Sequence, residues 1–394
     1  MSKFLSRICR CLKPWKPVFH LMYIITISYY LSKKPSTVYN IKKVERFLSD
    51  IRHVLLWTTI PGLNEEGQGI FIKHGCSFIN CYITTNRSLF GNLGYFDAVL
   101  FDVADVSAGA SDLPDVRSWT QKYIFVANDS SDNYPVCDPI YDEFFNWTWT
   151  YKSESTIGFR YITILNANDE LLDRRFLWIP PEKMKPIDLH LKSQLSSKSK
   201  AAAIFLDKCK SRSKREDYIR NLQKYLSKYN LVIDIFGECG TKKCKRKSMN
   251  NCFWRLKHQY YFYLAFEDSF AVDYVTKEVL YGYENFAVPV VYGGANYPSF
   301  LPPNSYLSAI RLDEKMMAEA MVLAIKNETI YHNFFRWRNH YSVKAAKGFE
   351  PCSLCEALNK KYWLTYKTKN YQFRKWWNPF YEQRCSSWPL NMFF

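Results

Sequence analysis

Apolar runs alternate with amphipathic segments between residues 201 and 294, and this alternation constrains the fold more than any other feature. The run AAAIFLDKC begins at residue 201, and the later segments LVIDIFG and YYFYLAFED have the apolar, β-branched or aromatic character of strands. Between the first two lies REDYIRNLQKYLSKY, whose apolar residues recur at helical spacing. Strand–helix–strand alternation predicts a parallel sheet covered by helices.

The stretch DYVTKEVLYGYENFAVPVVYGG, residues 273–294, extends this pattern. Asp273 is suited to cap a helix from about 274 to 285, whose apolar side chains fall on one stripe. The run AVPVVYGG is typical of a strand buried on both faces, with Pro289 near its start. Lys277 would then lie in the first helical turn, where the backbone amides favour an anion. A solvated Lys–Glu pair is the alternative interpretation.

The first half of the chain predicts a second α/β unit. HVLLWTTI at 53–60, FDAVLFDVA at 96–104 and KYIFVAND at 122–129 have the character of strands, and the Lys- and Ser-rich 191–200 predicts a linker. We therefore expect two Rossmann-like domains that face each other across a cleft. Their predicted limits are 49–190 and 201–350, followed by a cysteine-containing C-terminal tail at 351–394.

The N-terminus predicts attachment to a membrane. Residues 1–16 carry five basic side chains and no acidic one, and residues 17–32 read PVFHLMYIITISYYLS. Since a positive flank stays cytoplasmic and no small-residue cleavage site follows, we expect a cytoplasmic tail at 1–16, a signal-anchor transmembrane helix at 17–32 and a stem at 33–48. The body of the protein would then be lumenal. An amphipathic or core helix is the alternative, because the apolar segment is short for a bilayer.

Sequons and cysteines support a lumenal body. Glycosylation sequons occur at Asn86, Asn128, Asn146 and Asn327. Cys9 and Cys11 precede the predicted anchor, so ten of the 12 cysteines follow it, an even number suited to disulfides. Cys76 with Cys81 is the first pair that we expect, although sequence alone does not establish connectivity.

The net positive charge of the chain favours anionic partners. The chain has 54 Lys and Arg against 37 Asp and Glu, a net charge of +17, which suits phosphates, nucleic acid or a membrane surface. The basic run KKCKRK, 242–247, is more typical of a solvated face in a lumenal loop. Because a nucleic-acid function would leave the cysteine pattern unexplained, we expect no nucleic-acid partner.

The segment FYLAFEDSFAVDYVTKEVLYGYENFAVPVVYGGANYPSFLPPNSYL, 262–307, closely resembles the signature of the α1,3-fucosyltransferases, the GDP-fucose-dependent glycosyltransferase family 10. Further blocks match the family in its own order and cover most of residues 53–356: VLLWT at 54, CYITTNRSL at 81, FDAVLF at 96, FNWTWTY at 145, REDYIRNLQKY at 215, VIDIFGECG at 232 and FFRWR at 334. The resemblance implies a GT-B fold, with an acceptor-side N-terminal domain and a C-terminal domain that binds GDP-fucose.

The resemblance also implies the site residues. Asp129 occupies the position of the family's proposed catalytic carboxylate, which would take a proton from the acceptor hydroxyl. Arg215 matches its phosphate-binding arginine. The signature block implies further contacts with GDP-fucose for Glu267, Asp268, Tyr274, Lys277 and Glu278.

Several positions depart from the family pattern. Lys277 and Glu278 stand where the family has Glu then Lys, at the positions assigned to the diphosphate and ribose. Adjacent helix positions point about 100° apart, so we expect the reversal to turn the positive charge away from the phosphate. Asp129 is one methylene shorter than the family's glutamate. Further departures are Ser131 for proline, Asp102 for His and Asp268 for Asn, the last two adding negative charge at a domain interface.

We expect no essential metal or other cofactor, because GT-B enzymes stabilise the leaving diphosphate with side chains and helix dipoles. A zinc site is possible by count among Cys239, Cys244, Cys252, Cys352 and Cys355. The resemblance and the lumenal setting favour disulfides instead.

Two functions follow from the resemblance. The first is an inverting transferase in the Golgi membrane, a single-pass type II protein that moves L-fucose from GDP-fucose to N-acetylglucosamine of a glycan. The acceptor would be the core chitobiose of an N-glycan or a Lewis-type antenna. The second is a weakened or inactive homologue that binds nucleotide or glycan without turnover.

Overall fold

The computed structural model describes residues 42–44, 50–109, 112–172, 176–244, 249–360 and 372–386. The predicted signal anchor and most of the predicted stem lie outside these ranges. Within them, no helix combines the length and the apolar character needed to cross a membrane. Membrane attachment therefore stays a prediction.

The first half of the chain forms a six-stranded, all-parallel sheet in the order β3-β2-β4-β6-β7-β8. Every residue of the central strands β4 and β6 is buried, as a parallel strand with both faces covered requires. The strands are β2 (Arg52–Leu56), β3 (Cys81–Thr84), β4 (Ala98–Asp102), β6 (Lys122–Ala127), β7 (Trp147–Thr150) and β8 (Ile157–Gly158). Short helices α3 (Gly69–Lys73) and α4 (Val103–Ser107) lie in its connections.

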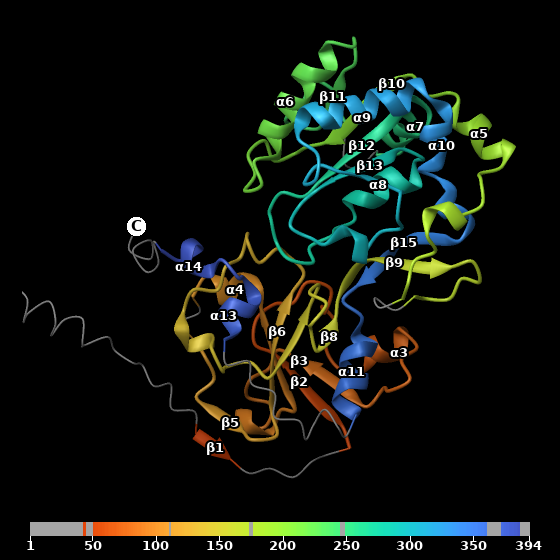
Figure 1. Cartoon of the computed structure of the whole chain (residues 1–394). Helices are drawn as coiled ribbons and strands as arrows, with labels where there is room; N and C mark the ends of the chain where they lie inside the picture. Colours follow the sequence, from red (N-terminus) through yellow and green to blue (C-terminus); the bar gives the residue numbers. More distant parts are fainter. Residues whose placement is uncertain are drawn as a thin grey trace, which may run out of the picture. The chain divides into compact units, whose positions relative to one another are not determined.

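The second half forms a five-stranded, all-parallel sheet in the order β11-β10-β12-β13-β14 (Figure 1). Its strands are β10 (Lys200–Phe205), β11 (Ile233–Phe236), β12 (Tyr260–Phe266), β13 (Val288–Tyr292) and β14 (Leu307–Ser308). The predicted strands and the predicted helix α6 (Arg215–Ser227) are confirmed. The predicted α/β class with parallel sheets is therefore correct.

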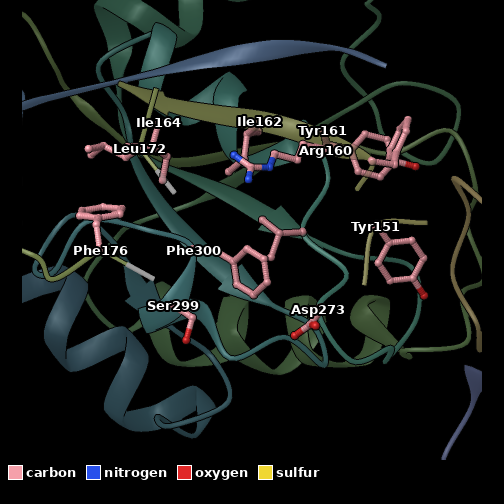
Figure 2. A pocket seen from close by; sticks show the side chains of 12 residues that line it. Tyr151, Arg160, Tyr161, Ile162, Ile164, Leu172, Phe176, Asp273, Ser299 and Phe300 are labelled. Atoms are coloured by element: carbon pink, nitrogen blue, oxygen red, sulfur yellow. The ribbon is translucent and has the colours of Figure 1, made fainter. Parts of the chain in front are cut away.

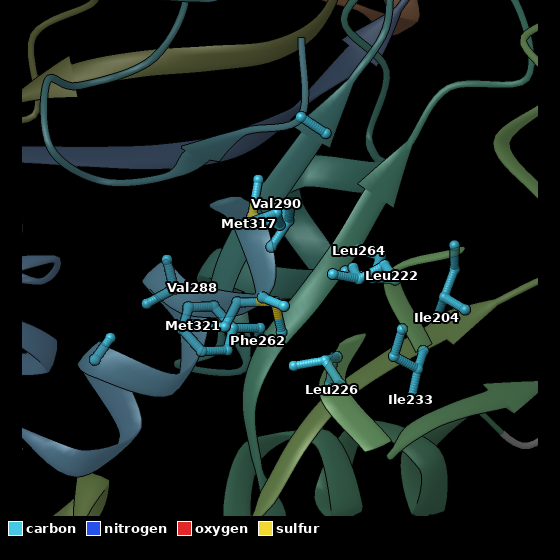
Figure 3. Packing of buried hydrophobic residues seen from close by; sticks show 14 of the residues in the cluster. Ile204, Leu222, Leu226, Ile233, Phe262, Leu264, Val288, Val290, Met317 and Met321 are labelled. Carbon is cyan, nitrogen blue, oxygen red and sulfur yellow. The ribbon is translucent and has the colours of Figure 1, made fainter. Parts of the chain in front are cut away.

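Alternate residues of β12 enter two separate cores. Phe262 and Leu264 pack with α6 and α9 (Glu314–Lys326), as Figure 3 shows. Tyr263 and Ala265 point to the other face, which is covered by α7 (Asn250–Gln259) and α8 (Glu278–Glu284). This two-residue period fixes the register of the strand, since a slip by one residue would exchange the two sets.

Beyond the second sheet the chain returns to the first. β15 (Tyr341–Gly348) pairs antiparallel with β9 (Arg160–Asn166). α11 (Pro351–Asn359) carries two cysteines, which are bonded to Cys76, ahead of β3, and to Cys81, the first residue of β3. α13 (Phe373–Trp377) packs on β6, where the Phe373 and Phe125 rings lie 4.8 Å apart, and α14 (Tyr381–Arg384) follows. The described part of the predicted C-terminal tail therefore packs on the first sheet.

Smaller elements complete the described chain. β1 pairs in parallel with β5, and α10 follows α9 directly. The bounds are β1 (Lys42–Val44), β5 (Val116–Ser118), α5 (Leu189–Leu195), α10 (Glu328–Asn333), η2 (Leu93–Tyr95), η3 (Pro139–Tyr141), η4 (Pro181–Lys183), η6 (Tyr297–Ser299) and η7 (Arg336–Asn339).

All ten cysteines beyond the predicted anchor form disulfides. The pairs are Cys76–Cys352, Cys81–Cys355, Cys137–Cys385, Cys209–Cys239 and Cys244–Cys252. The predicted Cys76–Cys81 pair is wrong, because each of these cysteines is bonded to α11, more than 270 residues away. The alternative of a zinc site is wrong for the same reason: each candidate sulfur is already bonded to another.

Two local predictions need correction. The helix expected from about 274 to 285 begins only at Glu278, and Asp273 does not cap it. Asp273 has a φ of +65° and its carboxylate accepts hydrogen bonds from the backbone and side chain of Ser153 instead. Most of the segment expected to be a linker, 191–200, belongs to α5 and to the first residue of β10.

Candidate active site

A cavity of about 610 Å³ lies at the carboxyl ends of β6, β10 and β12, the position at which parallel α/β sheets bind ligands. Its volume is in the range of ordinary ligand sites. All seven residues that the sequence assigns to catalysis or to the donor line it: Asp129, Arg215, Glu267, Asp268, Tyr274, Lys277 and Glu278.

Asp129 follows β6, and one of its two carboxylate oxygens is held in place. Oδ1 accepts the backbone N–H of Ser130 at 2.6 Å, the Nδ2 of Asn133 at 3.3 Å and the hydroxyl of Tyr274 at 3.4 Å. Within the described residues no hydrogen bond reaches Oδ2. The carboxylate is therefore oriented through one oxygen, and the other is available to accept a proton.

Asp268 lies beside Asp129, and its charge is compensated. Asn133 Nδ2 also donates to Asp268 Oδ1 at 3.0 Å, so one side-chain amide bridges the two carboxylates. Lys208 Nζ lies 3.5 Å from Asp268 Oδ2. Each of the two Asp268 oxygens therefore has a neighbouring donor, an amide at one and an ammonium at the other.

Arg215 begins α6, and its guanidinium reaches the end of β12. Nη1 donates to the carbonyl of Phe266 at 2.5 Å. Nε is buried and makes no hydrogen bond in the part of the chain that the structure describes. Arg215 also lines the cavity, so its guanidinium is suited to contact an anionic ligand there.

Replacing Arg215 by Ala should weaken the binding of GDP about 10- to 100-fold, since a charge-assisted contact contributes about 1.5–3 kcal/mol. Calorimetry with GDP measures the change. Arg220→Ala is the matched control, because Arg220 lies on the same helix and pairs with Asp217 on the surface. An unchanged affinity in Arg215→Ala would remove this residue from the site.

Lys277 and Glu278 line the same cavity, and the expected effect of their reversed order on the phosphate contact stays a prediction. Lys277 is the N-cap residue of α8, has φ and ψ values of −66° and −6° in the helical region, and is exposed. Glu278 is the first residue of α8 and accepts a hydrogen bond from the hydroxyl of Tyr263 at 2.7 Å. Both residues of the reversed pair therefore contribute to the lining of the cavity.

Glu267 is buried at the end of β12 and fixes the approach to α8. Its carboxylate accepts the backbone N–H of Thr276 at 2.8 Å and the Thr276 hydroxyl at 3.0 Å. Burial raises its pKa to about 8, and the nearby charges of Glu278 and Asp268 act in the same direction. Glu267 therefore acts mainly as a buried connection between β12 and α8.

This raised pKa has a measurable consequence for stability. Since the folded state binds the Glu267 proton more tightly than the unfolded state, whose pKa is near 4.5, the free energy of unfolding should fall as pH rises from about 4.5 to 8. In Glu267→Gln that part of the decline should disappear. Denaturant unfolding at pH 5, 6.5 and 8 tests it, with Glu65→Gln on the surface as control. Parallel curves for wild type and Glu267→Gln would contradict the assignment.

Tyr274 connects Asp129 to an aromatic group. Its ring contacts those of Tyr151 and Tyr161, with centroids 4.9 and 6.0 Å away. Burial raises the pKa of Tyr274, so its hydroxyl remains a donor. Tyr161 lines the main cavity and also a neighbouring pocket of about 40 Å³, which Figure 2 shows between Tyr151 and Phe300. That pocket has room for a few water molecules and not for a sugar ring.

Asp102 does not line the cavity. It is buried at the N-terminus of α4, and its Oδ1 accepts the backbone N–H of Ala104 at 2.9 Å. Burial raises its pKa, and the charges of Asp105 and Asp129 add to the effect. The side chain that stands at the family's His position therefore caps a helix.

Sequence analysis missed Lys208 and Asn133. Lys208 lines the cavity from the loop after β10, and with Asp268 it also lines an adjoining cavity of about 630 Å³. Lys208 lies near the end of the apolar run that begins at residue 201, and Asn133 lies four residues after Asp129.

The four sequons differ in accessibility. Asn86 and Asn327 are exposed, whereas Asn128 and Asn146 are partly buried. The side-chain oxygen of Asn146 accepts the backbone N–H of Tyr123 at 2.9 Å and a hydrogen bond from Arg117. Asn86 and Asn327 are therefore the better candidates for glycosylation.

Two parallel sheets and a polar cavity at the carboxyl ends of their strands define an α/β protein with a ligand-sized site. The sequence then places it in a family. Residues 49–162 match the family described as "Fucosyltransferase, N-terminal", and residues 195–376 match "Glycosyltransferase family 10 (fucosyltransferase) C-term". The chain belongs to glycosyltransferase family 10, the fucosyltransferases, as its motifs predicted.

Individual proteins agree with this assignment. The chain is 30% identical over 346 residues to alpha-(1,3)-fucosyltransferase C of Drosophila melanogaster, which covers 84% of this chain and 79% of that protein. It is 27% identical over 347 residues to glycoprotein 3-alpha-L-fucosyltransferase A of the same organism, over 83% of this chain and 60% of that protein. A crystal structure of an alpha1,3-fucosyltransferase with GDP-fucose is 12% identical, covers 84% of this chain and 96% of that one, and has a TM-score of 0.45. We draw no conclusion about this chain from a structural similarity at that TM-score.

Proposed function

We propose that the protein transfers L-fucose from GDP-fucose in α1,3 linkage to N-acetylglucosamine of a glycan, with inversion at the fucose C1. One observation carries this proposal. Asp129, whose Oδ2 accepts no hydrogen bond from the residues that the structure describes, lines the same cavity as the cationic side chains Arg215 and Lys277. Family membership supports the choice of donor, and the two Drosophila relatives described above are both fucosyltransferases.

The proposed reaction is a single displacement. The acceptor hydroxyl oxygen forms a bond to fucose C1 while the bond from C1 to the β-phosphate oxygen breaks, and its electron pair leaves with GDP. The hydroxyl proton goes to Asp129 Oδ2. Asn133 and Tyr274 donate hydrogen bonds to Oδ1 of Asp129, whose side chain is one methylene shorter than the family's glutamate. These contacts fix the orientation in which Oδ2 faces the acceptor.

Cations on the cavity wall would stabilise the leaving diphosphate. Three cationic side chains line the cavity, those of Arg215, Lys277 and Lys208. Preorganised cations act on the charge that develops on the leaving oxygen, so no metal ion is required in this proposal. Within the described residues no group of His, Cys, Asp or Glu side chains is arranged to hold one.

An inactive homologue that binds nucleotide or glycan is the second candidate, and the reversed Lys277–Glu278 pair favours it. Glu278 is tied to Tyr263, whereas Lys277 is exposed and has more freedom. Under this candidate the wild type shows no transfer. The combined change Asp129→Glu, Lys277→Glu and Glu278→Lys should then create activity, by restoring the family's arrangement.

An assay of the body of the protein, from about residue 34, with radiolabelled GDP-fucose decides between the two. Acceptors should include a core chitobiose N-glycan and a Lewis-type antenna, because both present N-acetylglucosamine. Transfer to either supports the enzyme and identifies the acceptor class. Absence of transfer to both, together with measurable GDP binding, would support the second candidate.

We also propose a Golgi location as a single-pass type II membrane protein, which rests on residues 1–32 of the sequence. The full-length chain should stay in the membrane pellet after carbonate washing, and a chain that starts near Lys34 should be secreted. Release of the full-length chain by carbonate would show that these residues do not span the bilayer.

A further inference from the structure

The loop that carries Asp129 accepts hydrogen bonds from the C-terminal segment 372–386. This segment includes α13 and α14 (dark blue in Figure 1). The buried side chain of Asn378 donates from Nδ2 to the carbonyl of Ser131 at 3.0 Å. Trp377 Nε1 donates to the carbonyl of Tyr134 at 2.8 Å, and Arg384 Nη2 donates to that of Asp132 at 3.0 Å. Three successive contacts therefore fix the backbone just after Asp129.

This segment is itself firmly anchored. Cys385 is bonded to Cys137 at the far end of the same loop. The ammonium of Lys152 donates to the carbonyls of Trp376 and Trp377, and the Trp377 ring lies 4.9 Å from that of Phe125 in β6. The segment 372–386, which contacts the Asp129 loop, is thus itself attached to the core of the first sheet.

Ser131 is the point at which these contacts matter most. It is buried, and its backbone N–H donates to the hydroxyl of Tyr151 at 2.9 Å while its carbonyl accepts from Asn378. Proline, which the family's pattern usually has here, restricts the backbone covalently but has no N–H to donate. In this chain two hydrogen bonds from buried side chains take over that restriction.

We propose that Asn378 is a positioning residue for Asp129, acting through Ser131. This inference rests on the proposed role of Asp129 as the base. The amide side chain suits the task, because Asn378 Oδ1 accepts the backbone N–H of Phe380 at 2.9 Å and so leaves Nδ2 aimed at Ser131. A carboxylate oriented through a short loop loses rate steeply when that loop moves by about 1 Å.

Asn378→Ala in the full-length chain should lower kcat about 10- to 100-fold while KM for GDP-fucose and the affinity for GDP stay within about twofold. Gln121→Ala is the matched control. Gln121 is equally buried and donates to the carbonyls of Leu93 and Phe96, but it precedes β6 whereas Asp129 follows it. The control should lose stability to a similar degree and keep its kcat.

A cycle with Asp129→Asn separates positioning from general weakening. If Asn378 acts through the base, Asn378→Ala should have no further effect on the residual rate of Asp129→Asn. An equal loss in both backgrounds, or an unchanged kcat in Asn378→Ala alone, overturns the proposal. Tyr151→Phe keeps the ring, removes the acceptor of the Ser131 N–H and should show the same pattern, which covers the case that Asn378→Ala does not fold.

Hydrogen exchange provides a readout that does not depend on transfer. Amides of 130–136 should exchange faster in Asn378→Ala than in wild type, and at wild-type rates in Gln121→Ala. A wild type without transfer would defeat the proposed function alone. Unchanged exchange in Asn378→Ala would defeat the positioning role alone.

Discussion

Asp129→Asn should lower the rate of fucosyl transfer about 10²- to 10⁴-fold and leave the affinity for GDP unchanged, because a general base acts on the acceptor hydroxyl and not on the nucleotide. The substitution preserves the shape of the side chain, and its amide oxygen still accepts the N–H of Ser130. Single-turnover transfer of radiolabelled fucose and calorimetry with GDP measure the two quantities.

Asp105→Asn serves as the control for this experiment, since Asp105 is exposed on α4. Turnover that survives Asp129→Asn would show that another group takes the proton. Asp102 caps α4 and does not line the cavity, so it is not placed to do so. Asp268, which shares the amide of Asn133 with Asp129, would then be the next carboxylate to test.

Removing both disulfides of α11 should destabilise the protein far more than removing either one. While Cys76–Cys352 is intact, Cys81–Cys355 closes only the short ring made by 76–81 and 352–355. In the chain-entropy model a short ring contributes less than about 3 kcal/mol. Without both bridges the nearest remaining link is Cys137–Cys385, and a loop on the order of 100 residues opens, which adds about 5 kcal/mol.

Three variants test this prediction: one with both cysteines of the first bridge changed to Ala, one with both cysteines of the second bridge changed, and one with all four changed. Their stability is measured by thermal and denaturant unfolding. The combined loss of about 7–8 kcal/mol approaches the whole stability of a typical domain, so the double variant should not fold at 37 °C. Cys244→Ala with Cys252→Ala is the control, since that bridge spans eight residues. A double variant that loses no more than the two single changes combined would show that α11 stays in place without covalent links.

Local sequence patterns predicted the sheets well, because a strand that is buried on both faces appears in the sequence as a continuous apolar run. Each apolar run of 201–294 became a strand of the second sheet, and Pro289 lies second in β13, as its missing N–H requires. Family motifs likewise located the cavity, since all seven predicted residues line it. The strands depend on neighbouring residues and the cavity residues on the family pattern, and both can be read from the sequence.

Features set by distant residues were not predictable in this way. Asp273 resembles a helix cap locally, but Ser153, 120 residues away, binds its carboxylate and α8 begins later. Asn133 and Asn378 gain their roles only when separate segments meet at the Asp129 loop. Cysteine spacing favoured near neighbours, whereas three of the five bridges join cysteines more than 240 residues apart.

The return of the C-terminal segments to the first sheet dictates the order in which a growing chain can mature. Cys76, Cys81 and Cys137 emerge from the ribosome long before their partners on α11 and beyond α14. During that interval Cys76 and Cys81 are each other's nearest available thiols, so the pair that spacing favours becomes the natural misfolded product. Maturation of this chain should therefore depend on thiol exchange late in synthesis, and nascent chains that stop before residue 351 should accumulate the Cys76–Cys81 bridge.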